Sequence, residues 1–361
     1  MKPRDHVGVL IIGAGFSGLG AAITLHKDGY TDFLVVERGN NVGGTWRVNT
    51  YPGAACDVPS HLYSYSFAPN RGWTISYSKQ PEIEAYIQRV ARQHQVLDRH
   101  RFGCEVHEVR WHAQEARWHV STSQGTFTSN FVVSAVGPLT EPALPDIDGL
   151  DEFEGEIFHS ARWNHDFDLT GKRVAIIGTG ASAIQIIPEL AKMVRQLDVY
   201  QRTAPWVLPR FDRDYKTAER LAFAHVPGYQ RVIRSAIYCS KELVGFALTY
   251  APKMLMPVQR LANRHIERAI GDPRLRAKVT PRWQIGCKRI LMSNTYYPAL
   301  AQPHVDVVTD HIAAVRPNAS VTADGNVREV DAIVVATGFH TTDSPTNQRI
   351  IGRGGHSLAD T

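Results

Sequence analysis

Residues 7–37 read VGVLIIGAGFSGLGAAITLHKDGYTDFLVVE, and this stretch decides the fold at the start of the chain. It opens with a short β-branched apolar run, which is typical of a buried parallel strand. A G-x-G-x-x-G motif and a helical segment come next, and a second apolar run over residues 33–37 ends in Glu37. The glycines of the motif are Gly13, Gly15 and Gly18. This order of elements predicts a β-α-β unit that binds a dinucleotide.

The chemistry of this first unit follows from its turn. Glycines between strand and helix let backbone N–H groups and the helix N-terminus approach a pyrophosphate. Glu37 lies 24 residues after Gly13, where a carboxylate can accept hydrogen bonds from ribose hydroxyls. We therefore expect the three glycines and Glu37 to bind the first dinucleotide.

The same pattern returns over residues 172–202. The run KRVAII is followed by GTGASA, by a helical segment and by the run LDVYQR, which ends in Arg202 instead of an acid. A carboxylate there would repel the 2′-phosphate of NADP, whereas a guanidinium pairs with it. The alternative is that Arg202 is a solvated surface residue. The residues expected to bind NADPH in this unit are Gly178, Gly180, Arg202 and Thr203.

The predicted fold is α/β, with two Rossmann-like dinucleotide-binding domains and a helical insertion. Two such sites in one chain imply FAD in the first and NADPH in the second, as in reductases and monooxygenases. We expect the FAD domain over residues 1–140 and the NADP domain over 150–338. Residues 211–282 interrupt the α/β alternation with helical spacing, which predicts the insertion. Its apolar run at 243–251 is interpreted as a core helix, with a substrate-pocket wall or a membrane-surface contact as alternatives.

Composition and charge exclude several classes of protein. Of the 361 residues, 43% are hydrophobic and 21% are charged, as in a folded globular chain. The net charge of +5 is scattered, without the Lys/Arg blocks that favour nucleic-acid binding. No apolar run reaches the length of about 18 residues that a membrane-spanning helix needs, so no span is expected.

The positions of the cysteines and histidines exclude further classes of site. None of the four cysteines forms a C-x-x-C pair, which excludes a zinc ribbon and a disulfide reductase. So few cysteines predict a reducing, cytoplasmic location. The histidines show no metal-ligand spacing, and the sequence therefore predicts no metal site.

Two longer fingerprints carry a family resemblance. The first has the form G-G-x-W-x4-Y-P-G-x3-D and consists of Gly43, Gly44, Trp46, Tyr51, Pro52, Gly53 and Asp57. The second has the form F-x-G-x3-H-x3-W and consists of Phe153, Gly155, His159 and Trp163. In order and spacing they resemble the fingerprints of the type I Baeyer–Villiger monooxygenases. Asn164 departs from the family's Pro or Asp, which leaves room for a related flavin monooxygenase that oxidises nitrogen or sulfur.

The resemblance implies an enzyme that uses FAD, NADPH and O2 to convert a ketone into an ester or lactone. In this family reduced flavin forms a C4a-peroxyflavin, and the anionic peroxide attacks the ketone carbonyl. Such an anion needs a fixed cation, and Arg289 matches the family's catalytic arginine. Asp57 matches the carboxylate that orients this arginine, and Lys288 matches a residue that binds the NADP 2′-phosphate. Gly44, Trp46 and Asp57 are expected to line the flavin site.

These assignments have structural alternatives. Asp57 could be a turn cap, and Lys288 with Arg289 could be a solvated strand end. His159 is interpreted as a structural hydrogen-bonding residue and not as an acid or base.

Members of the family continue for a long segment beyond the motif Ala-Thr-Gly-Phe, and this segment returns to the FAD domain. Here residues 339–361 match only its beginning. The expectation is therefore weak FAD binding and low activity, and a third hypothesis is a fragment that only binds nucleotide. The ketone and the oligomeric state are left open.

Overall fold

The structure is a computed structural model that describes residues 6–360, except for the side chain of Pro252. The chain divides into two compact units. The first unit consists of Met1–Val48, Gln80–Ala143 and Gly338–Thr361, and the second consists of Asn49–Lys79 and Leu144–Thr337. Residues 49–79, which we expected within the FAD domain, therefore pack with the second unit. The hydrogen bonds responsible are described with the site below.

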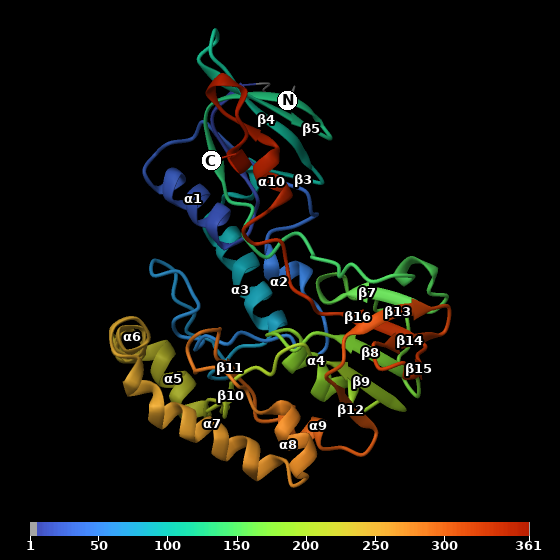
Figure 1. The fold of residues 1–361 in the computed structure, drawn as a ribbon. Helices are drawn as coiled ribbons and strands as arrows, with labels where there is room; N and C mark the ends of the chain where they lie inside the picture. The colour runs from blue at the N-terminus through green and yellow to red at the C-terminus, as the bar shows by residue number, and fades with distance from the viewer. Residues whose placement is uncertain (1–5, 361) are drawn as a thin grey trace. The chain divides into compact units, whose positions relative to one another are not determined.

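The described residues of the first unit form a seven-stranded sheet in the order β17-β4-β5-β6-β1-β2-β3 (Figure 1). Its strands are β1 (His6–Ile12), β2 (Phe33–Glu37), β3 (His100–Phe102), β4 (Val106–His112), β5 (Arg117–Thr122), β6 (Gly125–Ser134) and β17 (Ile350–Ile351). Strands β6, β1, β2 and β3 run parallel, whereas β4, β5 and β6 form an antiparallel meander. The predicted β-α-β unit therefore lies in the parallel part of a mixed sheet.

The helices of the first unit differ in how much they bury. They are α1 (Phe16–Lys27), α2 (Thr45–Val48), α3 (Gln80–Gln93) and α10 (Pro345–Gln348), with short 3-10 turns η1 (Leu97–Arg99), η5 (Arg353–Gly355) and η6 (Leu358–Asp360). The two longer helices, α1 and α3, bury one face each, whereas the short α2 and α10 have no buried residues. In α3 the buried residues recur at helical spacing, as in Ile83, Tyr86, Ile87 and Val90. Helix α1 buries Leu19 and Ile23.

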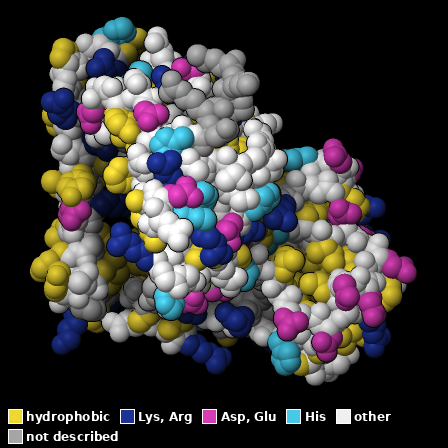
Figure 2. Space-filling view, turned by 90° about the horizontal axis from the view of Figure 1, so that it is seen from above, with side chains coloured by type: hydrophobic (Ala, Val, Ile, Leu, Met, Phe, Trp, Pro, Cys, Tyr) yellow, Lys and Arg dark blue, Asp and Glu magenta, His cyan; other side chains and the backbone are white. Residues whose placement is uncertain are grey.

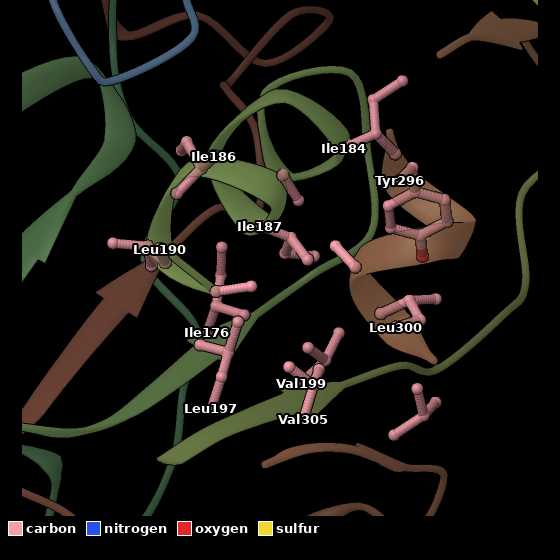
Figure 3. Packing of buried hydrophobic residues seen from close by; sticks show 14 of the residues in the cluster. Ile176, Ile184, Ile186, Ile187, Leu190, Leu197, Val199, Tyr296, Leu300 and Val305 are labelled. Carbon is pink, nitrogen blue, oxygen red and sulfur yellow. The ribbon is translucent and has the colours of Figure 1, made fainter. Parts of the chain in front are cut away.

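The second unit has a five-stranded, fully parallel sheet in the order β12-β9-β8-β16-β7. Its strands are β7 (Glu156–His159), β8 (Arg173–Ile177), β9 (Gln196–Tyr200), β12 (Val305–Val308) and β16 (Ala332–Val335). Helices α4 (Ala183–Leu190) and α9 (Tyr296–Leu300) pack together beside this sheet. Figure 3 shows Ile184 and Ile187 of α4 in one apolar cluster with Val199 of β9 and Tyr296 and Leu300 of α9.

Smaller elements complete the second unit. They are η2 (Leu150–Glu152), η3 (Ser160–Arg162), β10 (Val207–Leu208), β11 (Leu291–Met292) and the antiparallel β13 (Ile312–Arg316), β14 (Ala319–Thr322) and β15 (Val327–Glu329). The β10–β11 pair is parallel and connects the ends of the helical insertion to one another.

The insertion is helical, with α5 (Thr217–His225), α6 (Tyr229–Tyr250), η4 (Pro252–Leu255), α7 (Met256–Ala269) and α8 (Pro273–Val279). The interpretation of residues 243–251 as a core helix is wrong. Leu243 is 61% exposed, Phe246 is 53% exposed and Tyr250 is 75% exposed, whereas Ala247 is buried. Of the residues of α6, Gln230 and Ala247 are buried, and most of its large apolar side chains are exposed. None of the helices of residues 6–360 has the length and apolarity to cross a membrane.

Candidate functional site

The first glycine loop is packed so tightly that side chains cannot replace two of its glycines. Gly13 has a φ of +102°, and a Cβ there would lie 2.6 Å from the carbonyl oxygen of Ala135. A Cβ at Gly18 would lie 1.8 Å from the carbonyl oxygen of Gly13. Gly15 faces Gly44, whose Cα would lie 3.5 Å from a Cβ at Gly15. The loop is followed directly by α1, and the first turn of this helix holds only uncharged residues. The absence of an acidic side chain there suits the binding of a pyrophosphate at the helix N-terminus.

Glu37 holds this loop from the end of β2. It is 7% exposed, and its two carboxylate oxygens accept hydrogen bonds from the backbone N–H of Ala14 and of Gly39, both at 2.8 Å. The Arg47 guanidinium lies 3.3 Å from the same carboxylate. Arg47 was not among the site residues predicted from the sequence, although it directly follows Trp46 in the first fingerprint. Contact of Glu37 with a ribose stays a prediction.

The Gly43–Gly44 turn joins the first loop to α2. Gly44 has a φ of +53°, and a Cβ there would lie 2.7 Å from the Cα of Gly15. The backbone N–H of Trp46 donates to the carbonyl of Gly43, and the carbonyl of Trp46 accepts from the side-chain amide of Gln80. The structure thus places Gly44 beside the first glycine loop and fixes the backbone of Trp46 against α3.

The second glycine loop also has a tightly packed first glycine, but the space beside its second glycine is open. Gly178 has a φ of +115°, and a Cβ there would lie 2.5 Å from the carbonyl oxygen of Ala336. No atom of the described residues lies within 4 Å of where a Cβ of Gly180 would stand. The Thr179 hydroxyl donates to the carbonyl of Thr203 at 3.2 Å, so the loop after β9 contacts this turn. The first turn of α4 is also uncharged, and the turn can accept a phosphate beside Gly180.

The residues expected to bind the 2′-phosphate share one surface of the second unit. Arg202, Thr203 and Lys288 are all exposed. The indole N–H of Trp283 donates to the carbonyl of Ala204 at 3.0 Å, and the Lys288 ammonium lies 5.6 Å from the centre of the Trp283 ring. Trp283 therefore connects the segment that carries Lys288 to the segment that carries Arg202.

Asp57 and Arg289 form an ion pair within the second unit, although 232 residues separate them in sequence. The Asp57 side chain is 27% exposed and that of Arg289 is 61% exposed. The carboxylate therefore fixes one edge of the guanidinium while the rest of this cation stays open to a ligand. An arrangement of this kind can hold a positive charge in place for an anion.

The segment that carries Asp57 is clamped to α4. The Tyr51 hydroxyl donates to the side-chain carbonyl of Gln185 at 3.0 Å, and Gln185 also exchanges hydrogen bonds with both backbone groups of Ala55. Gly53 has a φ of +83°, and a Cβ there would lie 2.5 Å from the backbone carbonyl of Gln185. Burial raises the pKa of Tyr51, so its phenol stays a neutral donor. These contacts explain why residues 49–79 belong to the second unit.

Arg210, which was not predicted from the sequence, also holds the segment around Asp57. Its guanidinium donates to the carbonyls of Cys56 and Tyr77, each at 3.1 Å, and lies 4.8 Å from the centre of the Tyr77 ring. Burial raises the pKa of Cys56 to about 12, so this cysteine beside Asp57 is a thiol and not a thiolate nucleophile. No sequence pattern marks Arg210, because its partners come from a distant segment.

Comparison with known proteins gives the family. Residues 10–222 match the family model described as pyridine nucleotide-disulphide oxidoreductase. A Baeyer-Villiger monooxygenase of Streptomyces coelicolor is 52% identical over 99% of this chain and 69% of the relative. The chain belongs to this oxidoreductase family and to the Baeyer-Villiger monooxygenases.

Solved structures with FAD and NADP sites agree with this membership. Cyclohexanone monooxygenase from Rhodococcus sp. Phi1, bound to NADP+, matches with a TM-score of 0.85 at 31% identity, over 99% of this chain and 75% of that chain. OTEMO in complex with FAD and NADP matches with a TM-score of 0.85 at 29% identity, over 98% of this chain and 76% of that chain. The predicted α/β fold with two Rossmann-like domains is therefore confirmed, and FAD and NADP are the cofactors of this fold.

Three residues of the second fingerprint make packing contacts and hydrogen bonds within the second unit. A Cβ at Gly155 would lie 2.5 Å from the carbonyl oxygen of Asp331. His159 is buried at the end of β7, and its Nδ1 accepts from the backbone N–H of Ala161 at 3.1 Å. The ring of Trp163 packs edge-on against Phe158 at 4.9 Å between centres. These contacts support the interpretation of His159 as a structural residue.

Proposed function

We propose that the chain is an FAD- and NADPH-dependent monooxygenase that inserts one oxygen atom next to a ketone carbonyl. The ketone, O2, NADPH and a proton would give an ester or lactone, water and NADP+. The relatives named Baeyer-Villiger monooxygenase and cyclohexanone monooxygenase support this reaction class.

The observation that carries the proposal is the ion pair of Asp57 with Arg289. A Baeyer–Villiger reaction requires an oxygen species that stays anionic until it attacks the carbonyl, and an adjacent fixed cation keeps it so. Arg289 supplies this cation in the proposal, and Asp57 orients the guanidinium. Asp57 has a defined position because Gln185 and Arg210 hold the segment around it.

The two glycine loops supply the cofactor sites in this proposal. The first loop, with Glu37, Gly44 and Trp46, would hold FAD, which supplies the activation of O2 once it is reduced. The second loop would hold the pyrophosphate of NADPH at Gly180. Arg202, Thr203 and Lys288 would contact its 2′-phosphate, because an exposed guanidinium and ammonium pair with this dianion.

The alternative activity, oxidation of a nitrogen or sulfur nucleophile, finds no support in the residue that suggested it. Asn164 donates to the Glu156 carboxylate at 2.6 Å and accepts from the backbone N–H of Asp166 at 3.0 Å. This side chain is therefore engaged in a local turn, and these contacts do not favour the alternative activity.

An anaerobic titration followed by a ketone screen tests the proposal. FAD-reconstituted protein is mixed with NADPH, and the visible flavin band should bleach quickly, with much slower bleaching by NADH. Under air, added ketones should then give esters or lactones that are identified by mass. Flavin reduction without any ketone product across the screen would contradict the proposal, and the titration also measures whether FAD binds weakly. The cytoplasmic location stays a prediction.

Replacing Arg202 with Ala should raise the KM for NADPH about 10- to 100-fold, because hydrogen bonds to a charged group contribute about 1.5–3 kcal/mol. The KM for NADH should stay the same, since NADH has no 2′-phosphate. Steady-state kinetics with both cofactors measures the two values. Arg195→Ala is the matched control, because Arg195 is an exposed arginine of the same unit that precedes β9. An equal rise in the KM values for NADPH and NADH would show that Arg202 does not contact the 2′-phosphate.

Gly180→Val should weaken NADPH binding strongly while leaving the stability of the protein within about 1 kcal/mol of wild type. The side chain would enter the empty space in which no protein atom of the described residues lies within 4 Å. NADPH titration and urea unfolding of the same sample measure both effects. Unchanged NADPH affinity would place the pyrophosphate elsewhere.

A further inference from the structure

The β4–β5 hairpin of the first unit gathers three side chains that sequence spacing did not connect. His112 ends β4, Glu115 lies in the turn, and His119 lies on β5. Their ligand-type atoms, one nitrogen or oxygen from each residue, all lie within 4.8 Å of one another. Figure 2 shows that histidine and acidic side chains lie beside one another on the exposed surface of the protein.

The strand register explains the grouping. His112 is opposite Arg117, and His119 follows two residues later on the same strand. Because side chains alternate across a strand, His112 and His119 share one face as diagonal neighbours. Their rings stack at 3.8 Å between centres, and the Glu115 carboxylate lies 3.0 Å from Nε2 of His119.

The opposite face of the hairpin keeps these strands in place. Trp111 and Trp118 are paired across the strands and meet edge-on at 5.4 Å. Val109 and Val120 are buried in the apolar cluster of the first unit. The three side chains therefore project from a fixed backbone, and modest side-chain rotations suffice to bring them onto one ion.

We propose that His112, Glu115 and His119 form a binding site for a divalent transition-metal ion such as Zn²⁺. Two imidazole nitrogens and one carboxylate oxygen make a donor set that Zn²⁺ accepts, and water completes the coordination. On binding, the Glu115 carboxylate exchanges its contact with His119 for the metal. The ion would join both strands and the turn at three points.

Neighbouring charges set the strength of this site. Arg110 and Arg117 lie on the same face as the two histidines, and positive charge disfavours a cation. Glu108 neutralises Arg110 through two hydrogen bonds of 3.0 and 2.8 Å. Arg117 is thus the charge that opposes binding most directly, and Arg117→Gln should tighten it.

Titration of the untagged, metal-stripped, full-length protein with Zn²⁺ tests the proposal, with Co²⁺ as a spectroscopic probe. Calorimetry at pH 7.5 should give one Zn²⁺ per chain, and Co²⁺ should show the visible absorption of a histidine-ligated ion. His112→Ala, Glu115→Gln and His119→Ala should each weaken binding about 10-fold or more, since even loss of partners outside the coordination shell weakens metal binding that much.

His107→Ala is the matched control, because His107 is an exposed histidine of β4 outside the group of three. This variant should bind Zn²⁺ as wild type does, and circular dichroism should show that all variants fold. Absence of stoichiometric binding in the wild type would overturn the proposal. So would equal affinity in the His112, Glu115 and His119 variants, because binding would then occur elsewhere.

Discussion

Arg289→Ala is expected to lower the rate of ketone oxygenation by at least about 10²- to 10³-fold, which is the usual cost of removing one group that stabilises an anion in a reaction. Anaerobic reduction of FAD by NADPH should continue, because the second glycine loop and Arg202 are unaffected. Under air, NADPH oxidation should therefore yield hydrogen peroxide in place of ester. Product analysis by mass, together with NADPH and peroxide assays, measures this uncoupling.

Three further variants separate the effect of an oriented guanidinium from the effect of a positive charge alone. Arg289→Lys keeps the charge but loses the planar fork that pairs with Asp57, so it should recover only part of the activity. Asp57→Asn should show the same uncoupling more weakly, because the guanidinium loses its fixed orientation. Arg282→Ala removes an exposed arginine from the segment before Lys288 and should behave as wild type. Full oxygenation by Arg289→Ala would favour the alternative monooxygenase, which needs no such cation.

Gly18→Ala is expected to destabilise the protein by about 3 kcal/mol and to abolish stoichiometric FAD binding, because overpacking against backbone costs up to this amount. The added Cβ would stand 1.8 Å from the carbonyl oxygen of Gly13, and no rotation of a flexible side chain can relieve that contact. Helix α1 would have to move away from the loop, which removes its N-terminus from the pyrophosphate. Urea unfolding and flavin content after reconstitution measure both effects.

Gly245→Ala is the control for Gly18→Ala. Gly245 lies inside α6, and no atom of the described residues comes within 4 Å of its would-be Cβ. Alanine there should stabilise the helix by about 0.5–1 kcal/mol, because glycine loses more backbone entropy. If Gly18→Ala instead retained FAD and stability, the tight packing of the first loop would not be what positions its helix.

Local patterns were sufficient to predict both β-α-β units, their glycine turns and the helical insertion. A buried parallel strand, a sharp turn and an amphipathic helix each have short-range signatures in sequence. The exposure of residues 243–251 could not be predicted in the same way. Apolar residues at helical spacing specify a helix, but whether a neighbour covers Leu243 and Phe246 depends on the rest of the fold.

Long-range contacts account for the other differences. Residues 49–79 follow the first β-α-β unit in sequence, yet Tyr51 and Ala55 bind Gln185 and so pack with the second unit. Glu37 was predicted from its place at a strand end, but only the structure reveals that its carboxylate already binds the backbone of the loop. The histidines were dismissed for their spacing, which is unsuitable on a helix and becomes compact across a hairpin.

The sequence by itself determined the fold class, the two nucleotide-binding turns and the fingerprints of the family, because these depend on the local conformation of a few consecutive residues. The pairing of Asp57 with Arg289 was expected only from the family resemblance, and the tertiary structure brings the two residues together. Only the tertiary structure decided the contacts of Arg210 with the backbone carbonyl of Cys56 and of Trp283 with that of Ala204. Such pairs form where separate segments are held against a common sheet or helix, and the energy that selects them comes from packing and hydrogen bonds that no local pattern records.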